Sequence, residues 1–185
     1  MNKDLIRSQI RAAKALLGDE EKSTAAQKVF GRLEQMAAFM MADRILMYHS
    51  LPDELSTREF IARWCDRKQF FLPRVNGVNL EILPYDRSSL RLGSFHIEEP
   101  DGDNTVSVDE IEMVVVPAVA FDRRGNRVGR GKGYYDRLLA SLEAMKVGVG
   151  YDFQMRDDGD IESEPHDVPL DIVITESFTV SVRRT

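Results

Sequence analysis

Apolar residues recur at helical spacing in four stretches of the chain. Two of them, residues 3–17 and 20–41, each carry one apolar stripe and are predicted to be helices. A capping box, Ser56-Thr-Arg-Glu59, predicts the start of a third helix that ends near Lys68. Residues 134–145 repeat apolar positions in the same way and predict a fourth helix.

Short apolar runs between these helices predict strands. The runs cover residues 44–49, 69–75, 79–85, 111–121, 147–151 and 168–175. Asn76-Gly77 is a hairpin signal between the second and third runs. Because strands alternate with helices, the sequence predicts a single α/β domain over residues 1–185, a layered sandwich with a mainly parallel central sheet flanked by helices. In such sheets, ligands bind beyond the carboxyl ends of the strands.

Composition narrows the class of protein. A chain of 185 residues with 43% hydrophobic residues is long enough to bury a core, and its net charge of −6 argues against a general nucleic-acid partner. No apolar stretch approaches the about 20 residues of a membrane helix. The start of the chain lacks the apolar core of a signal peptide, and the single cysteine, Cys65, excludes an internal disulfide. We therefore expect a cytoplasmic protein without a membrane partner.

Positive charge and glycine are concentrated between the run that ends at Phe121 and the helix predicted from Tyr134. Residues 122–133 carry one carboxylate and five cations, which are Arg123, Arg124, Arg127, Arg130 and Lys132. Gly129, Gly131 and Gly133 alternate with the last two cations, and such glycines let backbone N–H groups turn toward a ligand. The helix start adds a partial positive charge. The pattern predicts an anion site, with polyphosphate as the leading candidate and a basic turn as the alternative.

Common catalytic motifs do not explain this segment. A Walker loop needs a hydroxyl residue after its lysine, whereas Gly133 follows Lys132. The dinucleotide fingerprint fails because Gly131 and Gly133 are followed by Tyr135 and then Asp136. The chain also lacks G-x-S-x-G, C-x-x-C and H-E-x-x-H, which excludes the usual serine-hydrolase and zinc motifs.

Two acids are candidate metal ligands. Asp136 follows the last glycine by three residues, in the first turn of the predicted helix, where a carboxylate either caps the helix or holds a metal over phosphates. Asp171 lies within the apolar run 168–175, and an unpaired carboxylate there is costly to bury. Magnesium or an arginine would satisfy Asp171, and we favour the metal.

Other charged residues stand at positions where strands or helices would present them to a ligand. Lys3 and Arg7 are four residues apart, on one helix face that either reaches a phosphate or is solvated. Glu54 ends a turn after a strand and would accept hydrogen bonds from an N–H-rich ring. His49 is a candidate pocket wall. Arg74, at a strand end, would meet either a phosphate or a substrate carboxylate.

The stretch from Phe121 to Asp136 (FDRRGNRVGRGKGYYD) resembles the signature of the 5-formyltetrahydrofolate cyclo-ligases, also called methenyltetrahydrofolate synthetases. Further similar motifs occur in the expected order, so the resemblance covers roughly residues 3–176. They are Lys3 with Arg7, Ser50–Glu54, Leu72-Pro-Arg74, Leu92-Gly93 with Glu99-Pro100, and Glu164–Asp171. The chain departs from the family pattern at Pro117-Ala118, where Pro-Gly is frequent, and at His49, where an aliphatic residue is common.

The resemblance implies an enzyme that couples ATP hydrolysis to closing 5-formyltetrahydrofolate into 5,10-methenyltetrahydrofolate. It implies that ATP is held by Lys3, Arg7, Arg127, Gly129, Gly131, Lys132, Gly133, Tyr134 and Tyr135. It further implies magnesium on Asp136 and Asp171, and a reduced folate against His49, Glu54, Arg74, Arg130 and Tyr134. Arg130 and Lys132 are expected to be catalytic, because phosphoryl transfer needs positioning and charge neutralisation.

Two other functions remain open from the residues. The first keeps the nucleotide site but acts on another small acid, as an ATP-dependent kinase or ligase. The second is a phosphate or folate sensor that binds without turnover.

Overall fold

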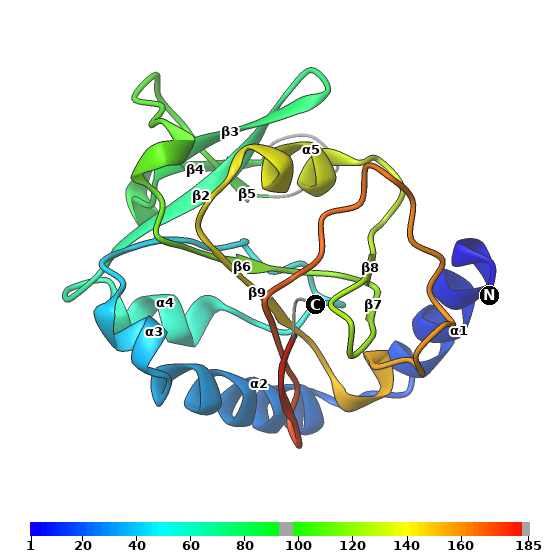
Figure 1. Ribbon diagram of the computed structural model, residues 1–185. Helices are drawn as coiled ribbons and strands as arrows, with labels where there is room; N and C mark the ends of the chain where they lie inside the picture. The colour runs from blue at the N-terminus through cyan, green and yellow to red at the C-terminus, as the bar shows by residue number, and fades with distance from the viewer. Residues whose placement is uncertain (93–97, 183–185) are drawn as a thin grey trace.

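A seven-stranded sheet forms the centre of the molecule (Figure 1). The computed structural model describes residues 1–92 and 98–182. The strand order is β11-β10-β9-β6-β1-β2-β3, and only the outermost pairs, β10–β11 and β2–β3, are antiparallel. The strands are β1 (Arg44–Leu46), β2 (Gln69–Asn76), β3 (Asn79–Pro84), β6 (Met113–Val116), β9 (Met145–Val149), β10 (Ile172–Ile174) and β11 (Thr179–Ser181). The predicted α/β fold with a mainly parallel sheet is confirmed.

Helices cover both faces of the sheet (Figure 1). One face carries α2 (Asp19–Glu34), α3 (Ala37–Met41) and α4 (Arg58–Trp64), and the other carries α5 (Tyr134–Ser141). Helix α1 (Lys3–Lys14) lies beside a small hairpin of β7 (Ala120–Phe121) and β8 (Arg127–Val128). A second small ladder pairs β4 (Leu90–Leu92) with β5 (Glu98–Pro100).

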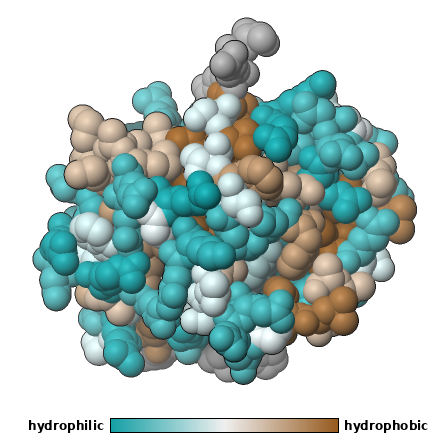
Figure 2. Space-filling view, turned by 90° about the horizontal axis from the view of Figure 1, so that it is seen from below, coloured by the Kyte–Doolittle hydropathy of each residue, from teal (hydrophilic) through white to brown (hydrophobic). Residues whose placement is uncertain are grey.

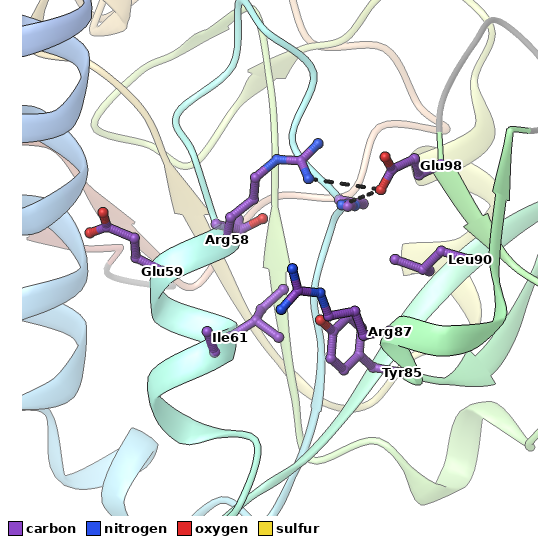
Figure 3. A pocket seen from close by; sticks show the side chains of 10 residues that line it. Arg58, Glu59, Ile61, Tyr85, Arg87, Leu90 and Glu98 are labelled. Carbon is purple, nitrogen blue, oxygen red and sulfur yellow. Dashed lines mark ion pairs between the residues drawn. The ribbon is translucent and has the colours of Figure 1, made fainter.

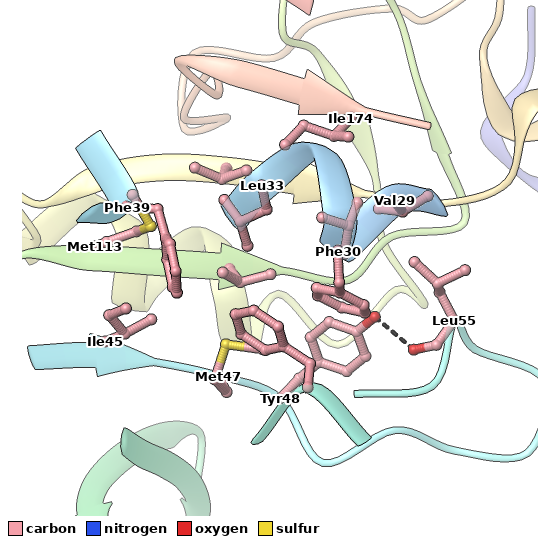
Figure 4. Packing of buried hydrophobic residues seen from close by; sticks show 14 of the residues in the cluster. Val29, Phe30, Leu33, Phe39, Ile45, Met47, Tyr48, Leu55, Met113 and Ile174 are labelled. Carbon is pink, nitrogen blue, oxygen red and sulfur yellow. Dashed lines mark hydrogen bonds between the residues drawn. The ribbon is translucent and has the colours of Figure 1, made fainter. Parts of the chain in front are cut away.

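The largest core cluster lies between the sheet and α2–α4 (Figure 4). Phe30 of α2 stacks on Phe60 of α4 with ring centroids 4.7 Å apart, and Phe39 of α3 packs edge-on against Trp64. The Trp64 indole N–H donates to Glu34 of α2 at 2.9 Å. On the other face, Leu138 and Leu139 of α5 join a second cluster with buried residues of β6. Both faces of the central strands are therefore buried, as parallel strands require.

Several element bounds differ from the sequence prediction. The expected helix 20–41 is two helices, since α2 ends at Glu34 and α3 begins at Ala37. The run 111–121 is not one strand, because β6 stops before Pro117 and the chain continues into β7. Proline has no N–H to donate to a ladder, which explains the interruption.

The predicted capping box at Ser56–Glu59 is not formed. Thr57 occupies the N-cap of α4 without a side-chain cap bond. Its hydroxyl instead donates to the Tyr48 carbonyl at 2.8 Å, and its N–H donates to the Ser50 hydroxyl. The Tyr48 hydroxyl in turn donates to the Leu55 carbonyl at 2.7 Å (Figure 4). These bonds fix the turn at residues 50–54, which follows β1.

The face on the side of α2 is mainly hydrophilic. In Figure 2, this face shows apolar residues in small groups among polar ones. Within the described residues, no helix has the length and hydrophobicity to cross a bilayer.

Candidate active site around the glycine loop

The β7–β8 hairpin presents the glycine loop. Asp122 at its tip is fully buried, and one of its carboxylate oxygens accepts the N–H groups of Arg124 and Asn126, each at 2.9 Å. Gly125 in the same turn has φ +82° and lies against the backbone of Leu170, whose N–H donates to its carbonyl at 2.9 Å. The hairpin is therefore anchored to the segment before β10, and the loop leaves it in a fixed direction.

Glycine is required by the backbone of this loop. Gly131 has φ +104° and Gly133 has φ +70°, both in the left-handed region that L side chains rarely adopt. Gly133 is also the N-cap of α5, with no side chain to bond the first N–H groups of the helix. Donors and the positive end of the helix dipole therefore meet at this point, as in other anion sites.

A buried ion pair lies beneath the loop. The Arg127 side chain is 5% exposed, and its Nη2 atom donates to Asp136 Oδ1 at 3.0 Å. Its Nη1 atom donates to the Pro117 carbonyl, and its guanidinium group lies 5.6 Å from the ring centroid of Tyr135. In residues 1–92 and 98–182, the Arg127 Nε atom has no hydrogen-bond partner. The structure thus brings Arg127 and Asp136, two of the residues singled out in the sequence, into direct contact.

Helix α1 carries Arg7, which contacts the glycine loop, and Lys3, which contacts the segment before β10. Arg7 Nε donates to the Gly129 carbonyl at 2.8 Å, and Arg7 Nη1 pairs with Asp4. The ammonium group of Lys3 bonds Glu164 and Asp167 at 3.4 and 3.3 Å. Among the described residues, Glu164, His166 and Asp167 are the one group of three that could hold a metal. The Lys3 ammonium already neutralises part of that cluster.

The turn at residues 50–54 forms the opposite side. Arg130 pairs with Asp53 at 2.9 Å and with Glu54 at 3.6 Å. Burial raises the pKa of Glu54, although the Leu51 N–H and Arg130 oppose that shift. Ion pairs of Arg130 therefore connect the glycine loop to the turn at residues 50–54.

Lys14 and Asp53 belong to this network. Lys14 was not singled out in the sequence, and Asp53, within the motif Ser50–Glu54, was given no role of its own. The Lys14 side chain is 8% exposed, with its Nζ atom 3.9 Å from Asp53. Burial lowers the pKa of Lys14, against the raising effect of Asp53. Lys14 lies seven residues after Arg7, which is two turns of α1 and hence the same face. That spacing was the signal available in the sequence.

The tyrosines and Lys132 complete the loop. Burial raises the pKa of Tyr135 far above its usual value, with Glu54 adding to the shift, so the phenol stays protonated. Tyr134 is half-buried, with the Arg137 guanidinium 5.5 Å from its ring centroid. The Lys132 side chain is exposed, while its carbonyl accepts from Arg137 at 2.9 Å.

The structure separates the two acids expected to share magnesium. Asp171 lies before β10, not within it, and accepts the Lys146 N–H at 2.9 Å. Lys146 pairs with Val114 near the amino-terminal end of β6. Asp136 is held near Pro117, because Arg127 bonds both of these residues. Pro117 lies three residues after Val114 along the chain. Three strand residues span about 10 Å.

Two oxygens bound to one magnesium ion lie within about 4 Å of each other. Asp136 and Asp171 therefore do not bind the same ion in this structure, and the prediction of a shared metal site is wrong. The prediction failed because the apolar run 168–175 begins before β10. Asp171 therefore lies at the amino-terminal edge of the sheet, opposite the edge that carries Asp136.

Within the described part of the chain, the contacts of Arg74 lie away from the glycine loop. Arg74 lies within β2 rather than at its end, and its guanidinium group pairs with Glu81 at 3.3 Å. It also donates to the Gly102 carbonyl at 2.7 Å. Arg74 thus ties β2 to β3 and to the segment after β5.

Two cavities open near the loop and the turn. The first, of about 600 Å³, is lined in part by His49 and Thr57, which flank the turn, and by Arg58, Tyr85, Arg87 and Glu98 (Figure 3). The second, of about 740 Å³, lies along α5, with Gly133 and Asp136 at one end and Pro165–Pro169 opposite. Both volumes suit a small-molecule ligand.

His49 is a wall of the first cavity. Its Nε2 atom lies 2.9 Å from Glu98, and its Nδ1 atom is buried with no hydrogen-bond partner among the residues described. Burial lowers the pKa of His49 and the charge of Arg58 lowers it further, whereas Glu98 opposes the shift. The imidazole is therefore neutral at physiological pH.

Residues 1–176 match the 5-formyltetrahydrofolate cyclo-ligase family. The chain belongs to this family. Two curated cyclo-ligases, from Haemophilus influenzae and Escherichia coli K12, are each 30% identical over 178 residues, which is 91% of this chain and 95% and 97% of theirs. The resemblance found in the sequence is therefore confirmed.

Solved structures agree. The 5,10-methenyltetrahydrofolate synthetase of Aquifex aeolicus superimposes with a TM-score of 0.90 at 30% identity, covering 100% of this chain and 95% of that one. The synthetase of Mycoplasma pneumoniae gives a TM-score of 0.76 at 27% identity, covering 95% and 99%. The family fold thus extends over the whole chain described above.

Proposed function

We propose that this protein closes 5-formyltetrahydrofolate into 5,10-methenyltetrahydrofolate with ATP, in the cytoplasm. The formyl oxygen attacks the γ-phosphorus and ADP leaves. N10 then bonds to the activated formyl carbon, the C–O bond to phosphate breaks, and the N10 proton is released. The observation that carries the proposal is the position of the glycine loop, which lies between the turn at residues 50–54 and the second cavity.

The nucleotide is assigned to the loop and the second cavity. Gly133 and Asp136 line one end of that cavity, so a nucleoside lying along α5 places its phosphates at the helix start. Arg7 and Arg127 lie against Gly129 and below the loop, where they neutralise phosphate charge. Lys3 reaches the phosphates from α1 if its bonds to Glu164 and Asp167 are exchanged.

Asp136 is the residue that fits a magnesium ion. Magnesium is usually held by one or two carboxylates together with substrate phosphates and water. Asp136 Oδ1 is engaged by Arg127, and the side chain remains 24% exposed at the start of α5. Magnesium at this position would supply charge neutralisation to the β- and γ-phosphates. Asp171, at the other end of α5, is not assigned to it.

The folate is assigned to the first cavity and the turn. Glu54 is half-buried beside Arg130, and its carboxylate suits the N–H groups of a reduced pteridine ring. The neutral His49 extends the wall of the same cavity. Arg130, bonded to the turn from the loop, is positioned to contact both substrates, and Lys132 supplies a further cation. No side chain is needed as a general base for the phosphoryl transfer.

The direct test is a spectroscopic assay. Purified protein with 5-formyltetrahydrofolate, ATP and magnesium should produce the methenyl chromophore, and omission of ATP should abolish the signal. ATP hydrolysis stimulated by a different small acid, with none by 5-formyltetrahydrofolate, would instead support a kinase or ligase for that acid. Binding of both ligands without turnover would support a sensor.

A further inference from the structure

Lys14 is a buried cation beside the turn at residues 50–54, and the proposed reaction gives it no role. It is the last residue of α1, and its side chain is 8% exposed. Among the described residues, Asp53 supplies the single ion pair of its ammonium group, at 3.9 Å. A charge-assisted hydrogen bond is shorter, at about 2.7–2.9 Å. The ammonium group is therefore removed from water without a close partner, which is costly.

Arg130 holds the carboxylate that Lys14 needs. Its Nη2 atom donates to Asp53 Oδ1 at 2.9 Å and to Oδ2 at 3.1 Å, and Oδ2 is also the oxygen that the Lys14 ammonium approaches. Burial lowers the pKa of Lys14, Asp53 opposes that shift, and the charge of Arg130 adds to it. Two cations thus compete for one carboxylate.

The two cations differ in their exposure to water. The side chains of Arg130 and Asp53 are each 49% exposed, and an exposed ion pair contributes little, so Arg130 leaves Asp53 at small cost. Glu54 holds Arg130 only weakly, because its oxygen is 3.6 Å from Nη2. Lys14 gains more from the exchange, since it is screened from water. A movement of about 1 Å by its flexible side chain would bring the ammonium group within hydrogen-bond distance of Asp53.

We propose that Lys14 is a positioning residue, which competes with Arg130 for Asp53 and thereby releases the Arg130 side chain to the phosphates of bound ATP. This inference rests on the proposed function, which places ATP at the glycine loop. In the structure, Arg130 is bonded to Asp53. When a phosphate takes Arg130, Asp53 turns to Lys14, so every charge keeps a partner and the buried ammonium group gains a closer one.

The test measures the KM for ATP in a double-mutant cycle of Lys14→Met and Asp53→Asn. Lys14→Met should raise this KM about fivefold, because Arg130 then stays on Asp53 without a competitor. Asp53→Asn should not raise it, because the charge that holds Arg130 is gone. In the Asp53→Asn background, Lys14→Met should change the KM by less than about twofold. If Lys14 only filled space at the end of α1, it would raise the KM equally in both backgrounds.

Lys22→Met is the matched control. Lys22 donates to the Pro52 carbonyl of the same turn at 3.3 Å, but within the described residues it pairs with no carboxylate. Its loss changes the net charge as that of Lys14 does, and it should leave the KM for ATP within about twofold of the wild type.

Four results would overturn this inference alone: an unchanged KM for ATP in Lys14→Met, an equal rise from Lys14→Met in both backgrounds, a rise from Asp53→Asn by itself, or a fivefold rise in the control. Absence of ATP-dependent turnover of 5-formyltetrahydrofolate by the wild type would overturn the proposed function itself.

Discussion

Asp136 and Asp171 are the residues whose roles the structure changes most. The first pairs with a buried arginine at the start of α5, and the second bonds the backbone of Lys146 at the other end of the helix. These two acids, from two different motifs of the family, therefore have different expected effects when substituted.

Asp136→Asn should lower turnover about 100-fold and raise the magnesium concentration needed for half-maximal rate, because it removes a charge at the phosphates. Asp171→Asn should leave that magnesium concentration unchanged and lower stability by about 1 kcal/mol, through a weakened bond to the Lys146 N–H. Titration of activity with magnesium checks both variants. An equal change in magnesium requirement would restore Asp171 to the metal site.

Lys14 is a buried charge that opposes folding. Since burial makes the pKa of Lys14 lower in the folded than in the unfolded state, its charged form disfavours the fold at every pH below the folded pKa. Lys14→Met leaves Asp53 paired with Arg130 and should raise the melting temperature by about 2–4 °C. Turnover should fall, because Asp53 and Arg130 lose a neighbour that positions them. A lower melting temperature with full activity would contradict this prediction.

Glu176 should give the protein a measurable pH dependence. Burial raises its pKa to about 6 from 4.5, so ionisation costs stability as the pH rises from about 4.5 to about 6. Asp152 adds to the shift by repulsion. Glu176→Gln should remove this pH dependence. At pH 7 its free energy of unfolding should exceed that of the wild type by at most about 1 kcal/mol, because the Glu176 side chain is partly exposed.

Urea unfolding of wild type and Glu176→Gln at pH 4.5, 5.5 and 7 checks this prediction. A constant difference in unfolding free energy across this range would contradict it.

At the scale of elements, the β7–β8 hairpin depends on close backbone contact. A Cβ atom on Gly125 would lie 2.5 Å from the Leu170 carbonyl oxygen, whereas one on Gly77, at φ +63°, would meet open space. Both Gly→Ala changes strain the backbone, by roughly 1 kcal/mol. Gly125→Ala should lower the free energy of unfolding by about 2 kcal/mol more than Gly77→Ala does, because the backbone at Gly125 or at Leu170 must move to make room for the Cβ atom.

Chemical denaturation of the two variants measures that difference directly. Gly125→Ala should also lower turnover, since the hairpin delivers the glycine loop. Equal stability losses for the two variants would show that the contact with Leu170 is not tightly packed.

The sequence predicted element types better than element ends. The parallel sheet and the Asn76-Gly77 hairpin followed from local pattern, and Gly77 indeed has positive φ. Pro117 was present in the run 111–121, but hydrophobicity outweighed it in the prediction. The position of Asp171 was not predictable in this way, because apolar residues continue past the ends of buried strands.

At the scale of the molecule, the site combines three distant segments: α1, the turn at residues 50–54 and the glycine loop. Arg7 on Gly129 and Lys14 near Asp53 are contacts across the chain, which no local motif encodes. The resemblance to the family predicted Arg7 as a site residue, whereas Lys14 was identified only from its position in the fold.

Nucleotide binding should therefore stabilise the whole molecule. At 100 times its dissociation constant, ATP with magnesium would add about 2.7 kcal/mol to the free energy of unfolding. Arg7→Ala should reduce the resulting rise in melting temperature and raise the KM for ATP, because one cation beside Gly129 is lost. Arg11→Ala, on an exposed position of the same helix, is the control. Equal KM values for ATP in the two variants would remove Arg7 from the site.

Trp64 also gives the molecule an intrinsic optical probe. It is the only tryptophan of the chain, its indole bonds Glu34, and its ring meets Phe39, so one chromophore stands where three helices pack. Neighbouring residues of α4, Ile61 and Ala62, line the first cavity. The intrinsic fluorescence of the unlabelled protein should therefore report both the separation of α2 from α4 during denaturation and the arrival of a reduced folate in solution.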